Sequence, residues 1–163
     1  MTEKKSSLPE NIQRKIDQWV TRYPTEQKRS GVLQALMFVQ EHNGGYLTEA
    51  LMDAVADYLE MPRIAVYEVA TFYSLYHLKP VGRHVIDVCT NISCMLRDSQ
   101  CIVDHIKKRL HINANETTTD GKFTLREVEC LAACAAAPMM QIGKKYYENL
   151  TPEKVDTILD GLE

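Results

Sequence analysis

The sequence predicts an α+β protein in which a helical N-terminal domain, residues 1–80, precedes a mixed C-terminal domain, residues 81–163. Three observations support this prediction. Apolar residues recur at helical spacing before Pro80, they alternate at strand spacing in segments beyond it, and Pro80 and Gly82 separate the two patterns. A chain of 163 residues is long enough for a small domain with an added helical segment, as this change of pattern indicates.

Four short helices are expected in the N-terminal domain. The first has apolar residues at every fourth position and ends before Pro24. The second is the apolar segment Val32 to Gln40, and a His-Asn-Gly-Gly sequence ends it. Thr48 is a suitable N-cap for the third helix, and Pro62 suits the first turn of a fourth that runs to about Tyr76. Short helices with short connections predict a small bundle.

The C-terminal domain is expected to run strand, helix, strand, hairpin, helix, which is a compact α+β or thioredoxin-like order. The single strands, 84–88 and 122–129, each lead directly into a cysteine, and a helix over 98–110 connects them. A Gly-Lys turn separates the two short strands of the hairpin. Thr151, followed by a proline, is expected to cap the last helix.

Composition and charge exclude several classes of function. A net charge of −3 and a pI near 6.0 argue against nucleic acid as the main partner. The longest apolar run, Cys130 to Met140, contains a proline and is too short to span a bilayer, so membrane association is expected only through another subunit. The N-terminus shows no signal peptide pattern, which favours a location in the reducing cytosol.

Polar composition predicts that the first seven residues and segment 113–121 are mobile.

Four of the five cysteines form two close pairs, Cys89-x4-Cys94 and Cys130-x3-Cys134, with 35 residues between the pairs. Each pair begins where a predicted strand ends, so the four sulfurs can meet if the strands are neighbours in the sheet. Four thiolates suit either zinc or an iron–sulfur cluster. Small apolar residues around the second pair favour the cluster, and no histidine adjoins either pair to support a Rieske-type site. The fifth cysteine, Cys101, is expected to be a partly buried structural thiol.

Ordered motifs along most of the chain resemble the E subunit family of bacterial NADH-quinone oxidoreductase (respiratory complex I), which is its thioredoxin-like [2Fe-2S] subunit. The resemblance covers roughly residues 10 to 162. The motifs that carry it are Val66-Tyr-Glu-Val-Ala-Thr-Phe-Tyr73, Pro80-Val-Gly-Arg-His-Val-Ile86, the two cysteine pairs, Ala137-Pro-Met-Met-Gln-Ile142 and Tyr147-Glu-Asn-Leu-Thr-Pro-Glu153. It implies one [2Fe-2S] cluster held by Cys89, Cys94, Cys130 and Cys134, in a thioredoxin-like ferredoxin domain that follows a helical domain. It assigns no catalytic residue to this chain.

The resemblance also implies partners and a location. The chain is expected to lie beside a subunit that carries FMN and oxidises NADH, among other peripheral-arm subunits of the complex. That place is cytoplasmic, at the inner face of the bacterial cell membrane. The chain has no G-x-G-x-x-G motif of its own for a dinucleotide. Two alternatives stay open, an equivalent diaphorase subunit of an NAD-linked hydrogenase or formate dehydrogenase, and a four-cysteine zinc adaptor.

Two positions near the second cysteine pair have specific backbone implications. Many relatives have glycine where this chain has Ala132, and an alanine is strained if the backbone there needs a positive φ. Pro138 precedes a predicted strand and resembles the cis-proline position of thioredoxin-like folds, although sequence alone does not determine the isomer.

Overall fold

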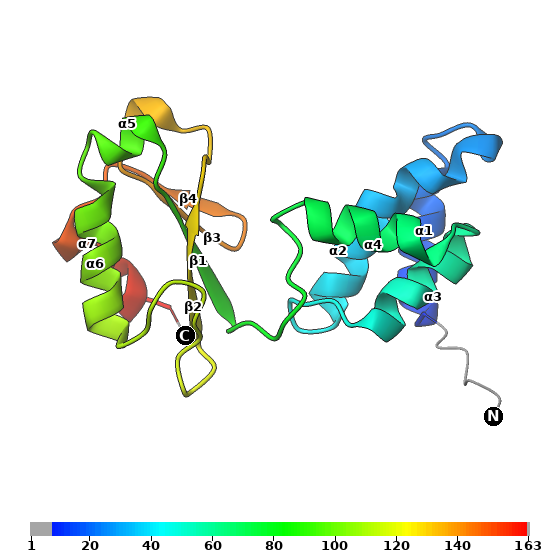
Figure 1. The fold of residues 1–163 in the computed structure, drawn as a ribbon, viewed down its shortest axis with the longest axis horizontal. Helices are drawn as coiled ribbons and strands as arrows, with labels where there is room; N and C mark the ends of the chain where they lie inside the picture. The colour runs from blue at the N-terminus through cyan, green and yellow to red at the C-terminus, as the bar shows by residue number, and fades with distance from the viewer. Residues whose placement is uncertain (1–7, 163) are drawn as a thin grey trace. The chain divides into compact units, whose positions relative to one another are not determined.

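The computed structural model describes residues 8–162, so the predicted mobility of the first seven residues lies outside the described part. The chain divides into two compact units, Met1–Pro80 and Val81–Glu163, which we call the helical unit and the sheet unit. Figure 1 shows helices alone in the first and a sheet with helices in the second. Each unit has its own buried apolar core.

Four α-helices and one 3₁₀ helix make up the described part of the helical unit, and they agree closely with the sequence prediction. Their bounds are α1 Glu10–Val20, η1 Thr25–Gly31, α2 Val32–His42, α3 Glu49–Leu59 and α4 Arg63–Phe72. The hydroxyl of Thr48 accepts a hydrogen bond from the Leu51 N–H at 3.3 Å, which confirms the predicted N-cap of α3. Ile12, Leu36 and Val55 are among the side chains buried between the helices.

The fourth helix is shorter than predicted. It ends at Phe72, because Tyr73 adopts an extended backbone with φ −88° and ψ 120°, and Pro62 is the N-cap rather than a first-turn residue. The chain then turns so that Tyr76 is buried, and its hydroxyl donates a hydrogen bond to the Leu33 carbonyl at 2.7 Å. This tertiary contact ends the helix earlier than the apolar pattern predicts. Several large apolar residues stay exposed nearby: Phe72, Tyr73, Leu75 and Leu78.

The sheet unit is built on four strands in the order β2-β1-β3-β4. The bounds are β1 His84–Cys89, α5 Ile92–Met95, α6 Ser99–Leu110, β2 Phe123–Val128, η2 Cys134–Ala136, β3 Met140–Ile142, β4 Lys145–Tyr147 and α7 Pro152–Asp160. Strands β1 and β2 are parallel, whereas β3 pairs antiparallel with both β1 and β4. The predicted order of strands and long helices is therefore confirmed, and the short helices α5 and η2 are additions to it.

Helices α6 and α7 lie on the same side of the sheet, as Figure 1 shows. The strands supply Ile86, Val88 and Leu125 to the buried core, and Ile106 of α6 and Val155 of α7 pack with them. The alternation of side chains along β1 places Asp87 on the opposite face of the sheet. The Thr151 hydroxyl accepts a hydrogen bond from the Lys154 N–H at 3.3 Å, as expected for the cap of α7.

Segment 113–121, expected to be mobile, is instead hydrogen-bonded along β2. The N–H of Asn115 donates to the Leu125 carbonyl at 2.7 Å, and the Thr118 N–H donates to the Phe123 carbonyl at 2.8 Å. The polar segment is thus hydrogen-bonded to β2, which is an edge strand of the sheet. Among residues 8–162, no helix has the length and apolar character needed to cross a bilayer.

Candidate iron–sulfur site

The two cysteine pairs lie at one edge of the sheet because they follow neighbouring parallel strands. The register pairs His84 with Phe123 and Cys89 with Val128, so β1 and β2 run side by side and end together. Beyond the last pair, the Thr90 N–H donates to the Val128 carbonyl at 3.0 Å. The carboxyl ends of parallel strands meet at one edge, which is a common place for ligand sites. The expectation that these strands are sheet neighbours is confirmed.

The first pair is buried and closed by one helical turn. The side chain of Asn91 accepts a hydrogen bond from the Ile92 N–H at 2.6 Å and caps the short helix α5. This turn brings Cys94 back to Cys89, and the two residues are 2% and 3% exposed. Burial, followed by the hydrogen bond and the charge of Cys89, raises the pKa of Cys94 to about 11. A metal or cluster must therefore displace a proton from this thiol on binding.

The second pair lies in an exposed loop in which one backbone N–H is directed at the Cys130 sulfur. Cys130 and Cys134 are both exposed. Ala132, between them, has a φ of 59°, in the left-handed region that the sequence analysis identified as strained for alanine. Its N–H donates to the Cys130 sulfur at 3.3 Å. Cys134 begins the 3₁₀ helix η2.

A small apolar cluster closes the inner side of the site. Met139 and Ala137 are buried with Cys89 and Cys94, and the partly buried Leu131 packs against them. The Met139 carbonyl accepts from the Cys89 N–H at 3.2 Å, and a backbone hydrogen bond from Met139 counteracts the rise in the pKa of Cys94. This cluster shields one side of the thiols from water, as a redox centre requires.

A cis peptide bond precedes Pro138, as at the corresponding position of thioredoxin-like folds. The Pro138 carbonyl accepts a hydrogen bond from the Leu150 N–H at 2.9 Å, and the Ala136 carbonyl accepts from the Asn149 N–H at 2.7 Å. These two bonds hold the cysteine loop against the segment that follows the β3–β4 hairpin.

The structure shows interactions among three of the four predicted ligands. Cys94 is hydrogen-bonded to Cys89 and interacts electrostatically with Cys134. Cys130 is held by its own loop, through Ala132. Over residues 8–162, no three histidine, cysteine, aspartate or glutamate side chains are grouped closely enough to hold a metal ion. Four thiols on two strand-end loops fit the donor set of an iron–sulfur cluster, and the assignment of all four as ligands stays a prediction.

Cys101 differs from its prediction, because it is exposed rather than partly buried. It lies in α6, whose buried side carries Ile102, Val103 and Ile106. Partial burial was expected because free cysteines usually pack as small apolar residues, but the helical rotation at position 101 directs the thiol outward. Its exposure makes it a useful control for the paired cysteines.

Three exposed apolar residues beside the first pair were not singled out as a surface by the sequence analysis. Ile92, Met95 and Leu96 are 65%, 56% and 76% exposed, and all lie in or next to α5. We call them the α5 rim. The apolar pattern does not reveal this surface, because the helical turn of α5 decides which side chains face outward.

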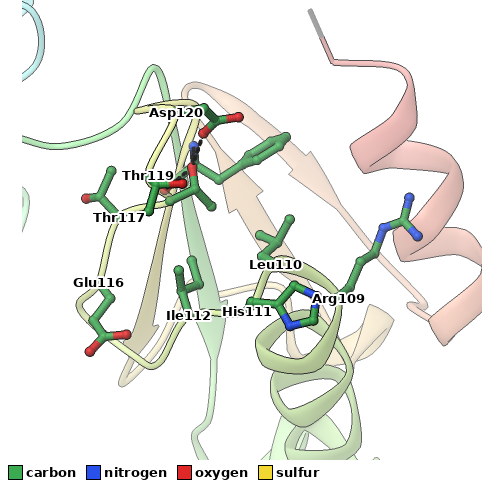
Figure 2. A pocket seen from close by; sticks show the side chains of 10 residues that line it. Arg109, Leu110, His111, Ile112, Glu116, Thr117, Thr119 and Asp120 are labelled. Atoms are coloured by element: carbon green, nitrogen blue, oxygen red, sulfur yellow. Dashed lines mark hydrogen bonds between the residues drawn. The ribbon is translucent and has the colours of Figure 1, made fainter.

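A hollow of about 640 Å³ lies at the other end of the sheet unit, where α6 ends and β2 begins. Figure 2 shows Glu116, Thr117 and Asp120 on its loop side and Arg109 reaching from α6 toward α7. Several of its polar groups are already paired. Arg109 binds Asp156 and Asp160 of α7, and Asp120 accepts from the Lys122 N–H at 2.9 Å. These contacts hold segment 113–121 and α7 in place, which is a structural role.

The strand order and the paired cysteines define a class of protein. A family model described as Thioredoxin-like [2Fe-2S] ferredoxin matches residues 16–163. The chain belongs to this family of thioredoxin-like [2Fe-2S] ferredoxins.

Relatives identify the particular member. The chain is 48% identical over 159 residues to the E subunit of the NADH-quinone oxidoreductase of Rickettsia bellii, an alignment that covers 98% of this chain and 91% of that protein. It is 42% identical over 150 residues to an E subunit of the NADH-quinone oxidoreductase of Rhizobium meliloti, covering 92% and 88%. At these identities the chain is a member of the E subunit family of NADH-quinone oxidoreductase, an oxidoreductase complex.

A solved structure supports the fold. An NAD+-reducing [NiFe]-hydrogenase in the air-oxidised state matches with a TM-score of 0.68 and 17% identity. The match covers 80% of this chain but only 22% of that chain. At this identity the likeness concerns the fold alone, and it includes more of the chain than the sheet unit.

Proposed function

We propose that Cys89, Cys94, Cys130 and Cys134 hold one [2Fe-2S] cluster and that the chain transfers electrons within NADH-quinone oxidoreductase. The observation that carries this proposal is the placement of both cysteine pairs at the carboxyl ends of two adjacent parallel strands. Membership of the thioredoxin-like [2Fe-2S] ferredoxin family supports the identity of the cofactor. When bound, such a cluster accepts and releases one electron at a time.

The chain's own residues supply ligands, hydrogen bonds and shielding. The buried thiols of Cys89 and Cys94 would bind on the inner side, against Met139, and the exposed thiols of Cys130 and Cys134 on the solvent side. Each pair spans one short loop, so each can supply two neighbouring thiolates. A backbone N–H donates toward Cys130 and stabilises negative charge on its sulfur.

A partner subunit must supply the electrons. NADH delivers a hydride, which carries two electrons, whereas this site exchanges single electrons. An FMN-carrying subunit that oxidises NADH would separate the pair and pass one electron to this chain. The α5 rim offers an apolar surface beside Cys94 against which such a subunit can exclude water. The complex would hold the chain in the cytoplasm, at the inner face of the bacterial cell membrane.

The ligand assignment is tested by replacing each paired cysteine by alanine in the full chain. We expect each of the four variants to lose the iron, the acid-labile sulfide and the visible absorption of the purified protein. The exposed Cys101→Ala is the matched control and should keep all three. Full iron content in Cys130→Ala would contradict the assignment. A colourless wild-type protein that contains zinc, with no electron-spin resonance signal after dithionite, would favour the zinc adaptor.

The docking surface is tested with Leu96→Asp, which places a carboxylate on the α5 rim. We expect weaker binding to the FMN-carrying subunit with an unchanged cluster spectrum, because Leu96 is 76% exposed and supports no core. Lys108→Ala makes the net charge equally more negative on an exposed position near the other end of α6 and should bind normally. Equal affinities of the two variants would remove the α5 rim from the interface.

The helical unit is expected to dock as well, because apolar side chains near Phe72 are exposed. The FMN-carrying subunit should slow limited proteolysis of residues 8–80. Digestion at the same rate with and without that subunit would eliminate this role.

A further inference from the structure

Ala132 has a backbone conformation that its side chain does not favour. Its φ of 59° lies in the left-handed region, where the Cβ of an L-residue crowds the next carbonyl oxygen. Among residues 8–162, the other non-glycine residues with positive φ are polar or charged: Glu60, Asp98, His111, Asn115 and Asn149. Three of these, Glu60, Asp98 and His111, are at helix ends. Ala132 instead lies midway between two cysteines.

This conformation accompanies a hydrogen bond to sulfur. The Ala132 N–H donates to the Cys130 sulfur at 3.3 Å, two residues back. With a positive φ at Ala132, the chain can turn back toward Cys134 while the preceding peptide keeps its N–H on that sulfur. An extended conformation at Ala132 would carry Cys134 away from Cys130. The strained residue and the N–H donor therefore belong to one local device.

A donor aimed at a ligating sulfur affects the two redox states of a cluster unequally. Reduction adds one electron, so negative charge on the irons and sulfurs increases. A hydrogen bond to charge is stronger than one to a neutral acceptor, so the N–H stabilises the reduced state more than the oxidised state. Cys130 is exposed, and the Ala132 N–H donates directly to its sulfur.

We propose that Ala132 is a positioning residue that raises the reduction potential of the [2Fe-2S] cluster, by holding its N–H on the Cys130 sulfur through a left-handed backbone. This inference rests on the proposed function, since it requires that the four cysteines bind the cluster. The residue shifts the one-electron reduction equilibrium of the bound cluster. The electron would come from the reduced flavin of the FMN-carrying subunit in the complex, and it comes from dithionite in the test.

The test removes the N–H and keeps the methyl group. In the full chain, the α-hydroxy acid lactate replaces alanine at position 132, which converts the amide into an ester. The same replacement at Ala135, an exposed alanine beyond Cys134, is the matched control. Dithionite titration followed by visible absorption and electron-spin resonance gives the potential of each reconstituted protein. Resonance Raman spectra give the iron–sulfur stretching frequencies.

We expect the ester at position 132 to make reduction about three- to tenfold less favourable, a tenfold change being about 59 mV for one electron. The ester at Ala135 should change it less than about twofold. Equal potentials of the two ester variants would overturn the proposal while leaving the cluster assignment intact. If the unmodified chain takes up no iron and sulfide, the proposed function fails instead, so the two failures are distinguishable.

Three genetic variants test the backbone conformation itself. Ala132→Gly and Ala132→Asn accept a positive φ and should keep the potential within about twofold of the wild-type equilibrium. Ala132→Val disfavours that φ because of its branched Cβ, and it should lower the potential in the same direction as the ester. A lowered potential in Ala132→Gly would overturn the proposal, and glycine leaves the loop free to fold.

Discussion

Met139 offers a direct test of how the sheet unit supports the cysteine site. Its side chain is fully buried, and it packs with Ala137, Cys89 and Cys94. The variant Met139→Ala leaves the backbone hydrogen bonds of residue 139 in place but removes most of the side chain behind both thiols. Truncation of a buried methionine to alanine costs about 2–5 kcal/mol, through lost burial and the cavity that remains. We expect a loss of about 3 kcal/mol in the free energy of unfolding of the sheet unit.

The assay follows the two units separately in urea with the cluster-free chain. Fluorescence of Trp19, the single tryptophan, reports the helical unit. The exposed Cys101, Cys130 and Cys134 react first with a thiol reagent, and the later reaction of the buried Cys89 and Cys94 reports opening of the sheet unit. The matched control is Met95→Ala, because Met95 is 56% exposed and should cost less than about 1 kcal/mol. The reasoning is refuted if both variants lose the same stability, or if Met139→Ala shifts the Trp19 transition as far as the thiol transition.

Three further predictions concern the scaffold. Gly82→Ala should destabilise the sheet unit by about 1–3 kcal/mol in thermal unfolding, because the new Cβ would lie 2.8 Å from the Phe123 carbonyl carbon and 2.9 Å from the Phe123 nitrogen. The control Gly161→Ala, whose new Cβ would have contacts of 3.4 Å or more, should be nearly neutral in the same assay. Burial raises the pKa of Tyr76 from 10.0 to about 12, so its contribution to the stability of the helical unit is present below pH 10 and lost between pH 10 and 12. Denaturation of Tyr76→Phe, followed by Trp19 fluorescence, should depend less steeply on pH in that window than the wild type; an identical slope would contradict the assignment. Thr151→Ala should cost about 1 kcal/mol in urea denaturation by removing the cap of α7, and Thr151→Ser should restore most of it.

Most of the fold could be predicted because the local signals agree with the tertiary contacts. Thr48 and Thr151 cap their helices as their sequence positions indicate, and the turn in the hairpin separates β3 from β4. The end of α4 could not be predicted from the pattern, because apolar residues continue to Tyr76 at helical spacing. The contact of Tyr76 with the Leu33 carbonyl, 43 residues away, favours the extended backbone at Tyr73.

The ligand set of the candidate site stays a prediction, and its local geometry was predicted incompletely. Spacing and strand ends predict Cys89, Cys94, Cys130 and Cys134 as one group, and the structure places both pairs at one edge of the sheet. The exposure of Cys101 was missed because the prediction rested on the usual burial of free cysteine, whereas the buried face of α6, with Ile102 and Ile106, leaves position 101 outside it. The helix α5 between the first two cysteines was missed because a four-residue helix has too few positions to show a period.

The amino-acid order by itself determined the two-unit organisation and the sequence of strands and long helices, and it predicts the four sulfurs that we propose as ligands. These features follow from local patterns of burial, capping and spacing, which need no knowledge of distant contacts. Only the tertiary structure decided that β1 and β2 lie side by side in parallel, that Met139 closes the space behind Cys89 and Cys94, and that Ala132 turns its N–H toward Cys130. The first two contacts depend on the packing of segments far apart in the chain, where the gain from burial outweighs the preference of any single residue. The third contact is local, but it accompanies a positive φ that alanine disfavours and that the residue type alone does not predict.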